Sequence, residues 1–190
     1  MISRPYATPI GALAPLVAAA LSLSAASCSA PLPSVADPTS AVHPLLGKPA
    51  PELTSAAVGG EGPKNLKAAL GKVVIVDFWA TFCEPCKRSF PKYQEMVEQF
   101  GGQVAVVAVS VDAPDAVSKD QLLAFAQQNH AKFAIAWDRV RGDIEHYGLR
   151  SLTIPSSFII DRTGTVRHVH VGFVEGEETR IEEELKALVK

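Results

Sequence analysis

The stretch from Val73 to Pro91 constrains the fold more than any other part of the sequence. It reads VVIVDFWATFCEPCKRSFP. Its first seven residues are apolar except for one acid and are rich in β-branched side chains, which predicts a buried strand. From Pro85 onward, large apolar side chains recur three or four residues apart on one face, which predicts a helix to about Phe100. A strand that passes directly into a helix is a building unit of α/β folds.

Two cysteines, Cys83 and Cys86, lie at the junction of this strand and this helix. A helix N-terminus presents free N–H groups and the positive end of the helix dipole, and both favour a thiolate over a thiol. Cys83 is therefore the expected nucleophile. Cys86 follows one turn later on the same side, within the Cα separation that a disulfide can bridge. The pair can open and close without refolding of the chain.

The segment WATFCEPCKRSFP resembles the active-site segment of thioredoxin-fold oxidoreductases, most closely the TlpA/ResA type of the AhpC/TSA-redoxin-like superfamily. The resemblance extends from about Gly47 to the C-terminus. It implies an α/β thioredoxin fold with a mixed central sheet, flanking helices, an N-terminal hairpin extension and an inserted central helix. It also implies an enzyme that needs no cofactor and reduces protein disulfides outside the cytoplasm, with cytochrome c maturation as one role of such proteins.

Asp77 is a carboxylate within an otherwise apolar strand. Such a group must either be satisfied by hydrogen bonds or have a raised pKa. The resemblance implies a buried acid at this position that handles the proton of the second cysteine, Cys86. The alternative is a carboxylate at a strand edge that accepts hydrogen bonds from the backbone.

Several further residues are predicted to contact the substrate. The resemblance implies that Pro155 is cis and packs beside the cysteine pair, which leaves the backbone of Ile154 free to bond an incoming polypeptide. The alternative is an ordinary loop proline. Trp79, Glu84 and Pro85 match the motif around the cysteines and are expected to take part in substrate binding.

Charged residues near the cysteines, and two differences from the motif of the resembling family, bear on the reaction of the pair. Glu84 opposes a thiolate on the neighbouring cysteine, whereas Lys87 and Arg88 favour it. On balance we expect a reductant, closer in potential to thioredoxin, at roughly −270 mV, than to DsbA, at roughly −120 mV. Phe82 replaces a Trp that usually precedes the first cysteine. Ser89 replaces an acid of ResA-type proteins, which argues against a specific cytochrome c maturation role.

Other chemistries of a C-x-x-C pair fit the sequence less well. Half of a zinc site needs further ligands, but the remaining cysteine is Cys28 and the histidines lie far off, so no metal is expected. A thiol peroxidase of the same superfamily would need Thr three residues before its cysteine, whereas Thr81 is two residues before Cys83. A non-enzymatic copper carrier of this fold would need C-x-x-x-C and a matching His. The peroxidase and the copper carrier remain the alternatives.

The rest of the domain alternates strands and helices. Ser118 and Gln121 predict a capping box at the start of the inserted helix. The expected elements after the first helix are strand 103–110, helix 118–129, strand 133–136, helix 144–147, strand 157–161, strand 165–171 and helix 175–189. The last two strands are expected to form an antiparallel hairpin. His168 and His170 share one face of the second of them, which we interpret as an exposed polar face.

The N-terminal part has the composition of an export signal and a tether. Arg4 is the one charged residue among the first 28, and residues 10–27 are uncharged and largely apolar. The string that ends in Cys28 resembles a bacterial lipoprotein cleavage box, so we predict signal 1–28, a flexible linker at 29–46 and the thioredoxin-like domain at 47–190. The alternatives are a secreted protein cut near Ala26 or Ala30, and an uncleaved membrane anchor.

Length and charge limit the partners. The chain has 190 residues and a formal net charge of −2, which fits one ordinary domain. With neither a basic stripe nor a recognition motif, nucleic acid is not an expected partner. The predicted partners are disulfide-containing proteins, a membrane or periplasmic dithiol that donates electrons, and the membrane itself through a lipid on Cys28. The predicted location is the bacterial periplasm or cell envelope.

Overall fold

The computed structural model describes residues 43–149 and 152–190. The predicted signal, Cys28 and the linker up to residue 42 lie outside the described residues. In the part of the chain that is described, no helix is both long and apolar enough to span a bilayer.

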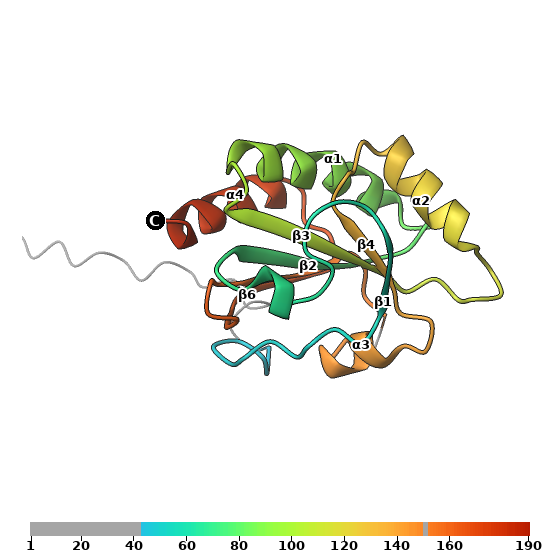
Figure 1. Ribbon diagram of the computed structural model, residues 1–190, viewed down its shortest axis with the longest axis horizontal. Coiled ribbons are helices and arrows are strands. Elements are labelled where there is room, and N and C mark those ends of the chain that lie inside the picture. The colour runs from blue at the N-terminus through green and yellow to red at the C-terminus, as the bar shows by residue number, and fades with distance from the viewer. Residues whose placement is uncertain (1–42, 150–151) are drawn as a thin grey trace, which may run out of the picture. The chain divides into compact units, whose positions relative to one another are not determined.

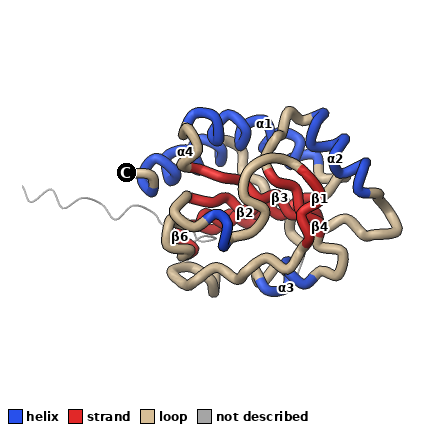
Figure 2. Tube along the Cα trace, viewed as in Figure 1, coloured by secondary structure: helices blue, strands red, loops and turns tan. Residues whose placement is uncertain are grey.

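One mixed sheet organises the described residues, with the strand order β1-β4-β3-β2-β5-β6 (Figures 1 and 2). β2, β3 and β4 are parallel, whereas β1 pairs with β4, β5 with β2 and β6 with β5 in antiparallel register. The strands are β1 (Ala56–Gly59), β2 (Val73–Trp79), β3 (Val104–Ser110), β4 (Ala134–Trp137), β5 (Ser156–Ile160) and β6 (Val166–Val171). The predicted α/β thioredoxin fold, including the antiparallel hairpin of the last two strands, is confirmed.

Helices cover both faces of this sheet. In Figure 1, α1 (Glu84–Gln99), α2 (Lys119–Gln128) and α4 (Glu177–Leu188) lie over one face, and α3 (Gly142–His146) lies on the other. All residues of β2 and β3 are consequently buried, as expected for central strands of an α/β sheet. A short 3₁₀ helix, η1 (Lys67–Ala69), precedes β2.

The inserted helix α2 begins as its sequence predicts. The Ser118 hydroxyl accepts the Gln121 backbone N–H, and the Gln121 side chain accepts the Ser118 N–H. Phe125 points inward from α2 and stacks on Trp79 of β2, with ring centroids 4.7 Å apart. The insertion therefore contributes to the core beside the active-site segment.

The N-terminal extension takes a different form from the expected hairpin. β1 pairs with β4 at one edge of the sheet, whereas Pro49 makes an isolated bridge to Thr165 near the other edge. The two parts of the extension thus pair with different partners and not with each other. Leu45 and Leu46, at the end of the predicted linker, already pack against the core.

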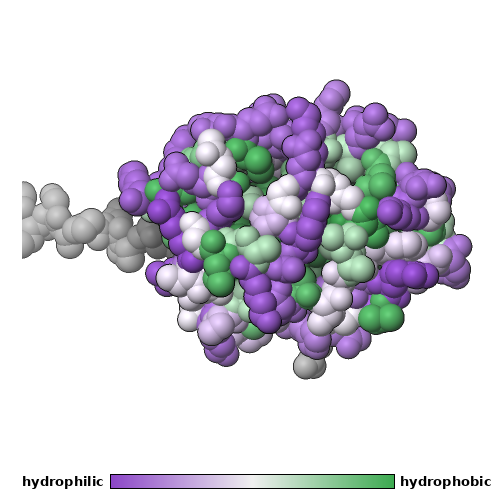
Figure 3. Space-filling view, in the orientation of Figure 1, coloured by the Kyte–Doolittle hydropathy of each residue, from purple (hydrophilic) through white to green (hydrophobic). Residues whose placement is uncertain are grey.

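The face drawn in Figure 3 carries mainly hydrophilic side chains with separate apolar areas. The expectation of an exposed histidine face on β6 is wrong, because α4 covers that face. His168 is partly buried, and the ring of His170 is buried between carboxylates of α4.

Candidate active site

The two cysteines form a disulfide at the N-terminus of α1. The Cα atoms of Cys83 and Cys86 are 5.3 Å apart, within the usual range for a disulfide. Cys83 is the N-cap of the helix, and its sulfur accepts the backbone N–H of Cys86 at 3.3 Å. Pro85 lies in the first turn, where its missing N–H breaks no helical hydrogen bond. The local sequence thus sets the position of both sulfurs.

The sulfurs differ in accessibility. Cys83 is 5% exposed, whereas Cys86 is fully buried. Beside them, the Lys87 ammonium lies 2.6 Å from the Glu84 carboxylate, so these two charges offset each other. Phe82, which is 69% exposed, presents an apolar ring next to the accessible cysteine.

Asp112 holds the loop that leads into Cys83. This carboxylate follows β3 and is buried. Its oxygens accept the Thr81 backbone N–H at 3.0 Å and the Thr81 hydroxyl at 2.7 Å. The Ser110 hydroxyl donates to the same carboxylate at 2.9 Å. A turn with a hydrogen bond from Cys83 N–H to Ala80 O, 3.0 Å long, then connects to the helix.

Asp77 lies on β2, faces Tyr93 in the middle of α1 and is fully buried. The Ser157 hydroxyl donates to its Oδ1 at 2.8 Å, and the Tyr93 hydroxyl lies 2.7 Å from Ser157 Oγ. The other oxygen, Oδ2, has no hydrogen-bond partner among the described residues. Burial raises the pKa of Asp77 to about 7, against the lowering effect of the bonds from Ser157 and Tyr93. Asp77 can therefore exchange a proton near neutral pH.

The Ile154–Pro155 bond is cis, as the resemblance implies. Because Ser156 pairs with Phe78, Pro155 lies level with the end of β2, where the active-site loop begins. The Pro155 carbonyl accepts the Gly172 N–H at 2.9 Å, and Ile154 is half-buried. The fold thus brings this segment to the same end of the sheet as the cysteines.

Trp79 does not reach the surface. Its ring is fully buried, stacks on Phe125 and meets the edge of Phe90 at a centroid distance of 4.9 Å. The prediction that this side chain takes part directly in substrate binding is therefore not supported by its position. Trp79 packs beneath the site, where it joins β2 to α1 and α2.

Comparison with known proteins identifies the family. Residues 46–169 match the AhpC/TSA family. The chain belongs to this family. ResA of Bacillus thuringiensis, a thiol-disulfide oxidoreductase, is 33% identical over 147 residues, which cover 75% of this chain and 78% of that protein. The thioredoxin-like protein YneN of Bacillus subtilis is 32% identical over 132 residues, covering 70% and 75%.

Solved structures agree with this assignment to the AhpC/TSA family. A crystal structure assigned to a thiol:disulfide interchange protein DsbE from Chlorobium tepidum superimposes with a TM-score of 0.65 at 33% identity. The superposition covers 76% of this chain and 98% of that one. StoA from Bacillus subtilis shares the fold, with a TM-score of 0.54 at 22% identity over 70% and 96% of the two chains. This AhpC/TSA-family protein is a thiol-disulfide oxidoreductase.

Three polar partners of the oxidoreductase site are not among the residues predicted from the sequence. In the sequence, Tyr93 lies on the apolar face of the predicted helix, Ser157 begins a predicted strand and Asp112 lies between two predicted elements. A signal was present for Tyr93 and Ser157, because each is a polar group within a mostly apolar face or strand, whereas nothing in the sequence distinguishes Asp112 from other loop acids. The identity of the partners, however, depends on contacts between segments 16 to 80 residues apart.

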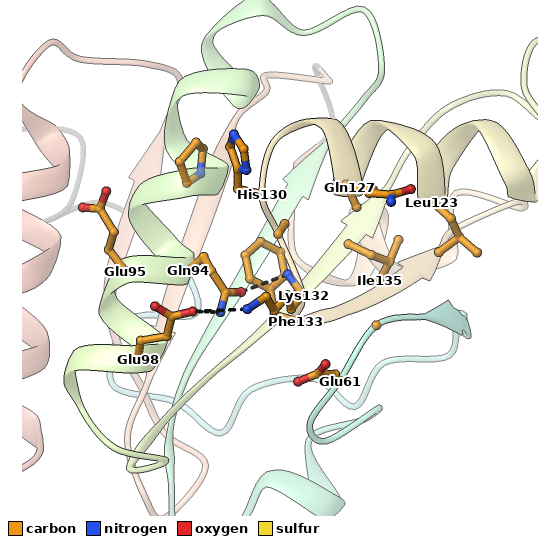
Figure 4. A pocket seen from close by; sticks show the side chains of 14 residues that line it. Glu61, Gln94, Glu95, Glu98, Leu123, Gln127, His130, Lys132, Phe133 and Ile135 are labelled. Atoms are coloured by element: carbon orange, nitrogen blue, oxygen red, sulfur yellow. Dashed lines mark hydrogen bonds and ion pairs between the residues drawn. The ribbon is translucent and has the colours of Figure 1, made fainter.

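A cavity of about 770 Å³ lies between α1, α2 and β4 (Figure 4). Leu123, Phe133 and Ile135 contribute apolar surface, and Figure 4 shows Gln94 and Glu98 of α1 directed toward Lys132. The Lys132 backbone N–H donates to the Gln94 side chain at 2.9 Å. Neither cysteine lines this cavity, so it is separate from the redox site of the oxidoreductase.

Proposed function

We propose that Cys83 and Cys86 form a redox dithiol that reduces disulfides of other proteins outside the cytoplasm. The unequal exposure of the two cysteine residues supports this proposal most directly, since Cys83 retains 5% exposure and Cys86 is fully buried. In the reduced protein, the Cys86 N–H and the helix N-terminus stabilise a thiolate on Cys83. Cys83 is accordingly the nucleophile and Cys86 the resolving cysteine.

The reaction transfers two electrons in two displacement steps. The Cys83 thiolate attacks one sulfur of the substrate disulfide, forms a mixed disulfide and releases the other substrate sulfur as a thiolate. The Cys86 thiol then loses its proton, and its thiolate attacks Cys83. This second step breaks the mixed disulfide, releases the second substrate thiolate and leaves the enzyme oxidised. A dithiol donor in the membrane or periplasm completes the cycle by reducing the Cys83–Cys86 disulfide.

Asp77 is the proposed acceptor of the Cys86 proton. A carboxyl group with a pKa of about 7 is ionised in a large fraction of molecules at neutral pH and can still release the proton afterwards. Its free oxygen, Oδ2, is available to a proton donor. The hydroxyls of Ser157 and Tyr93 hold the other oxygen in place.

The substrate polypeptide is proposed to bind across the end of the sheet that carries the disulfide. Glu84 and Pro85 precede Cys86 in the first turn of α1, and Ile154, two residues before the start of β5, offers its backbone. Phe82 adds an exposed apolar ring to this surface. The cis bond to Pro155 sets the backbone direction of the segment that carries Ile154.

The location is proposed from the N-terminal sequence. The apolar stretch 10–27 would direct export, and a lipid on Cys28 would hold the domain at the membrane through the linker 29–46. Incorporation of labelled palmitate into the wild type and its loss in Cys28→Ala tests this. Export with no label in either protein favours a plain secreted form.

A trapping experiment tests the activity and finds the substrates. Cys86→Ser should accumulate mixed disulfides on Cys83, and Cys83→Ser, the matched control, should not. The purified wild-type domain should also reduce insulin in the presence of a dithiol. Apocytochromes c among the trapped proteins support the maturation role that the ResA-type resemblance implies. Absence of insulin reduction together with rapid peroxide turnover would favour the thiol peroxidase instead.

A further inference from the structure

Polar residues on three neighbouring strands lie in one row across the sheet. Asp77 of β2 is in register with Ser157 of β5, and Ser157 is in register with His170 of β6. Residues opposite each other on neighbouring strands share a face of the sheet. All three side chains therefore face the side covered by α1 and α4, which Figure 1 shows packed over the same face.

The outer end of this row is a charged cluster on β6 and α4. His170 is 2% exposed, and its two ring nitrogens lie 2.9 Å from Glu177 and 2.8 Å from Glu184. The Arg180 guanidinium lies 3.2 Å from Glu184, and His168 of β6 lies 3.2 Å from the same carboxylate. Burial lowers the pKa of His170, but the bonds and charges of the two carboxylates outweigh it, and the net direction is upward.

The inner end of the row is the buried acid. Asp77 is faced by Tyr93 from α1 and Ser157 from β5, and the charge of Glu177 on α4 acts to raise its pKa. The resolving cysteine, Cys86, belongs to the first turn of α1, the helix that covers this face. Strands in a sheet are about 4.8 Å apart, so the backbones of Asp77 and His170 are separated by about 10 Å. At that distance in a protein interior, charges still interact appreciably, because little solvent lies between them to screen the field.

We propose that the His170–Glu177 ion pair tunes the redox reaction as a positioning element. The pair sets the electrostatic potential at Asp77, from which His170 is separated by Ser157 on the intervening strand. This inference rests on the proposed role of Asp77 as acceptor of the Cys86 proton. A negative charge on Glu177 strengthens the hold of Asp77 on its proton, and a protonated His170 counteracts it. The pair thereby sets the pH at which Cys86 resolves the mixed disulfide.

Two substitutions at this pair should act in opposite directions. Glu177→Gln removes the negative charge and retains a polar group beside His170, so Asp77 should ionise at lower pH. His170→Gln removes one positive charge and leaves both carboxylates and Arg180, whose guanidinium lies 3.3 Å from His170 Nδ1, so Asp77 should ionise at higher pH. A purely structural role for the cluster would weaken folding in both variants without opposite shifts.

The test follows the Asp77 carboxyl carbon by ¹³C NMR during a pH titration of the oxidised protein, in which the cysteines do not titrate. The spectrum of Asp77→Asn assigns the signal. We expect the midpoint to fall by about half a pH unit or more in Glu177→Gln and to rise by a similar amount in His170→Gln. Glu178→Gln removes the same charge from the next position of α4 and should change the midpoint by less than about 0.2 units.

Two outcomes overturn the inference: midpoints that stay within about 0.2 units of wild type in Glu177→Gln, or shifts of the same sign in both variants. If His170→Gln does not fold, the sign and size for Glu177→Gln decide alone. The pH dependence of mixed-disulfide resolution distinguishes failure of the tuning role of the His170–Glu177 pair from failure of the proposed function. If Asp77→Asn leaves the pH dependence of resolution unchanged, the proton-accepting role of Asp77 is wrong. If Asp77→Asn changes this pH dependence but Glu177→Gln and His170→Gln do not move the Asp77 midpoint, the proton-accepting role stands and only the role of the His170–Glu177 pair is wrong.

Discussion

Replacing Asp77 by asparagine should stabilise the folded protein increasingly as the pH rises. Burial raises the pKa of this carboxyl from 3.8 to about 7 in the folded state. The folded state therefore binds the proton more tightly than the unfolded state, and stability falls as the pH rises between these two values. Above about pH 7 the wild type has lost all of this pH-dependent stability, whereas Asp77→Asn, whose side chain stays uncharged, loses none of it.

The magnitude follows from the interval between the two pKa values. At about 1.4 kcal/mol per pH unit, the interval from 3.8 to about 7 corresponds to about 4 kcal/mol. About 1.6 kcal/mol of this is already lost at about pH 5. The difference in unfolding free energy between Asp77→Asn and wild type should therefore grow by about 3 kcal/mol from about pH 5 to about pH 9.

Urea unfolding of both proteins with the disulfide intact measures this difference. Asparagine also changes the hydrogen bonds to Ser157 and Tyr93, but that change adds an offset that is the same at every pH. Titration of groups that are not coupled to Asp77 cancels between the two proteins. A difference that stays constant within about 0.5 kcal/mol over this range would refute the raised pKa and, with it, the proposed proton transfer.

Three further substitutions test separate parts of the structure. Ser118→Ala removes the N-cap of α2 and should lower the unfolding free energy by about 1 kcal/mol in urea unfolding; no loss would contradict the capping geometry. Gly60→Ala should cost more than about 2 kcal/mol, because a Cβ there would lie 1.9 Å from the Phe133 carbonyl oxygen. The control Gly62→Ala has nearly the same φ, +81° against +80°, with open space around it and should cost only about 1 kcal/mol. Phe82→Ala should leave stability within about 0.5 kcal/mol of wild type and lower kcat/KM for insulin but not for a small disulfide; an equal loss for both would exclude a role in protein binding.

The active-site segment could be predicted from the sequence because its determinants are local. The apolar run of β2, the helical spacing that follows and the helix start at Cys83 all depend on residues within one turn or a few positions of one another. The same holds for the capping box at Ser118 and for the turn between β5 and β6. The disulfide between Cys83 and Cys86 is likewise a short-range contact.

The sequence suggested that Asp77 was special, because an acid in an apolar strand needs a partner. It did not identify that partner. Ser157 is 80 residues away and meets Asp77 because β5 pairs with β2 in one particular register. Tyr93 reaches both groups because α1 crosses the same face of the sheet.

Tertiary structure alone decided the environment of His170. Alternation along β6 correctly placed His168 and His170 on one side, but whether that side meets water depends on where α4 packs. Capping and hydrophobic periodicity act between near neighbours in the chain, and the amino-acid sequence displays them directly. Strand register and helix packing join residues that are distant in the chain, so the burial of a polar side chain and its charged partners emerge only when the sheet and its covering helices are assembled.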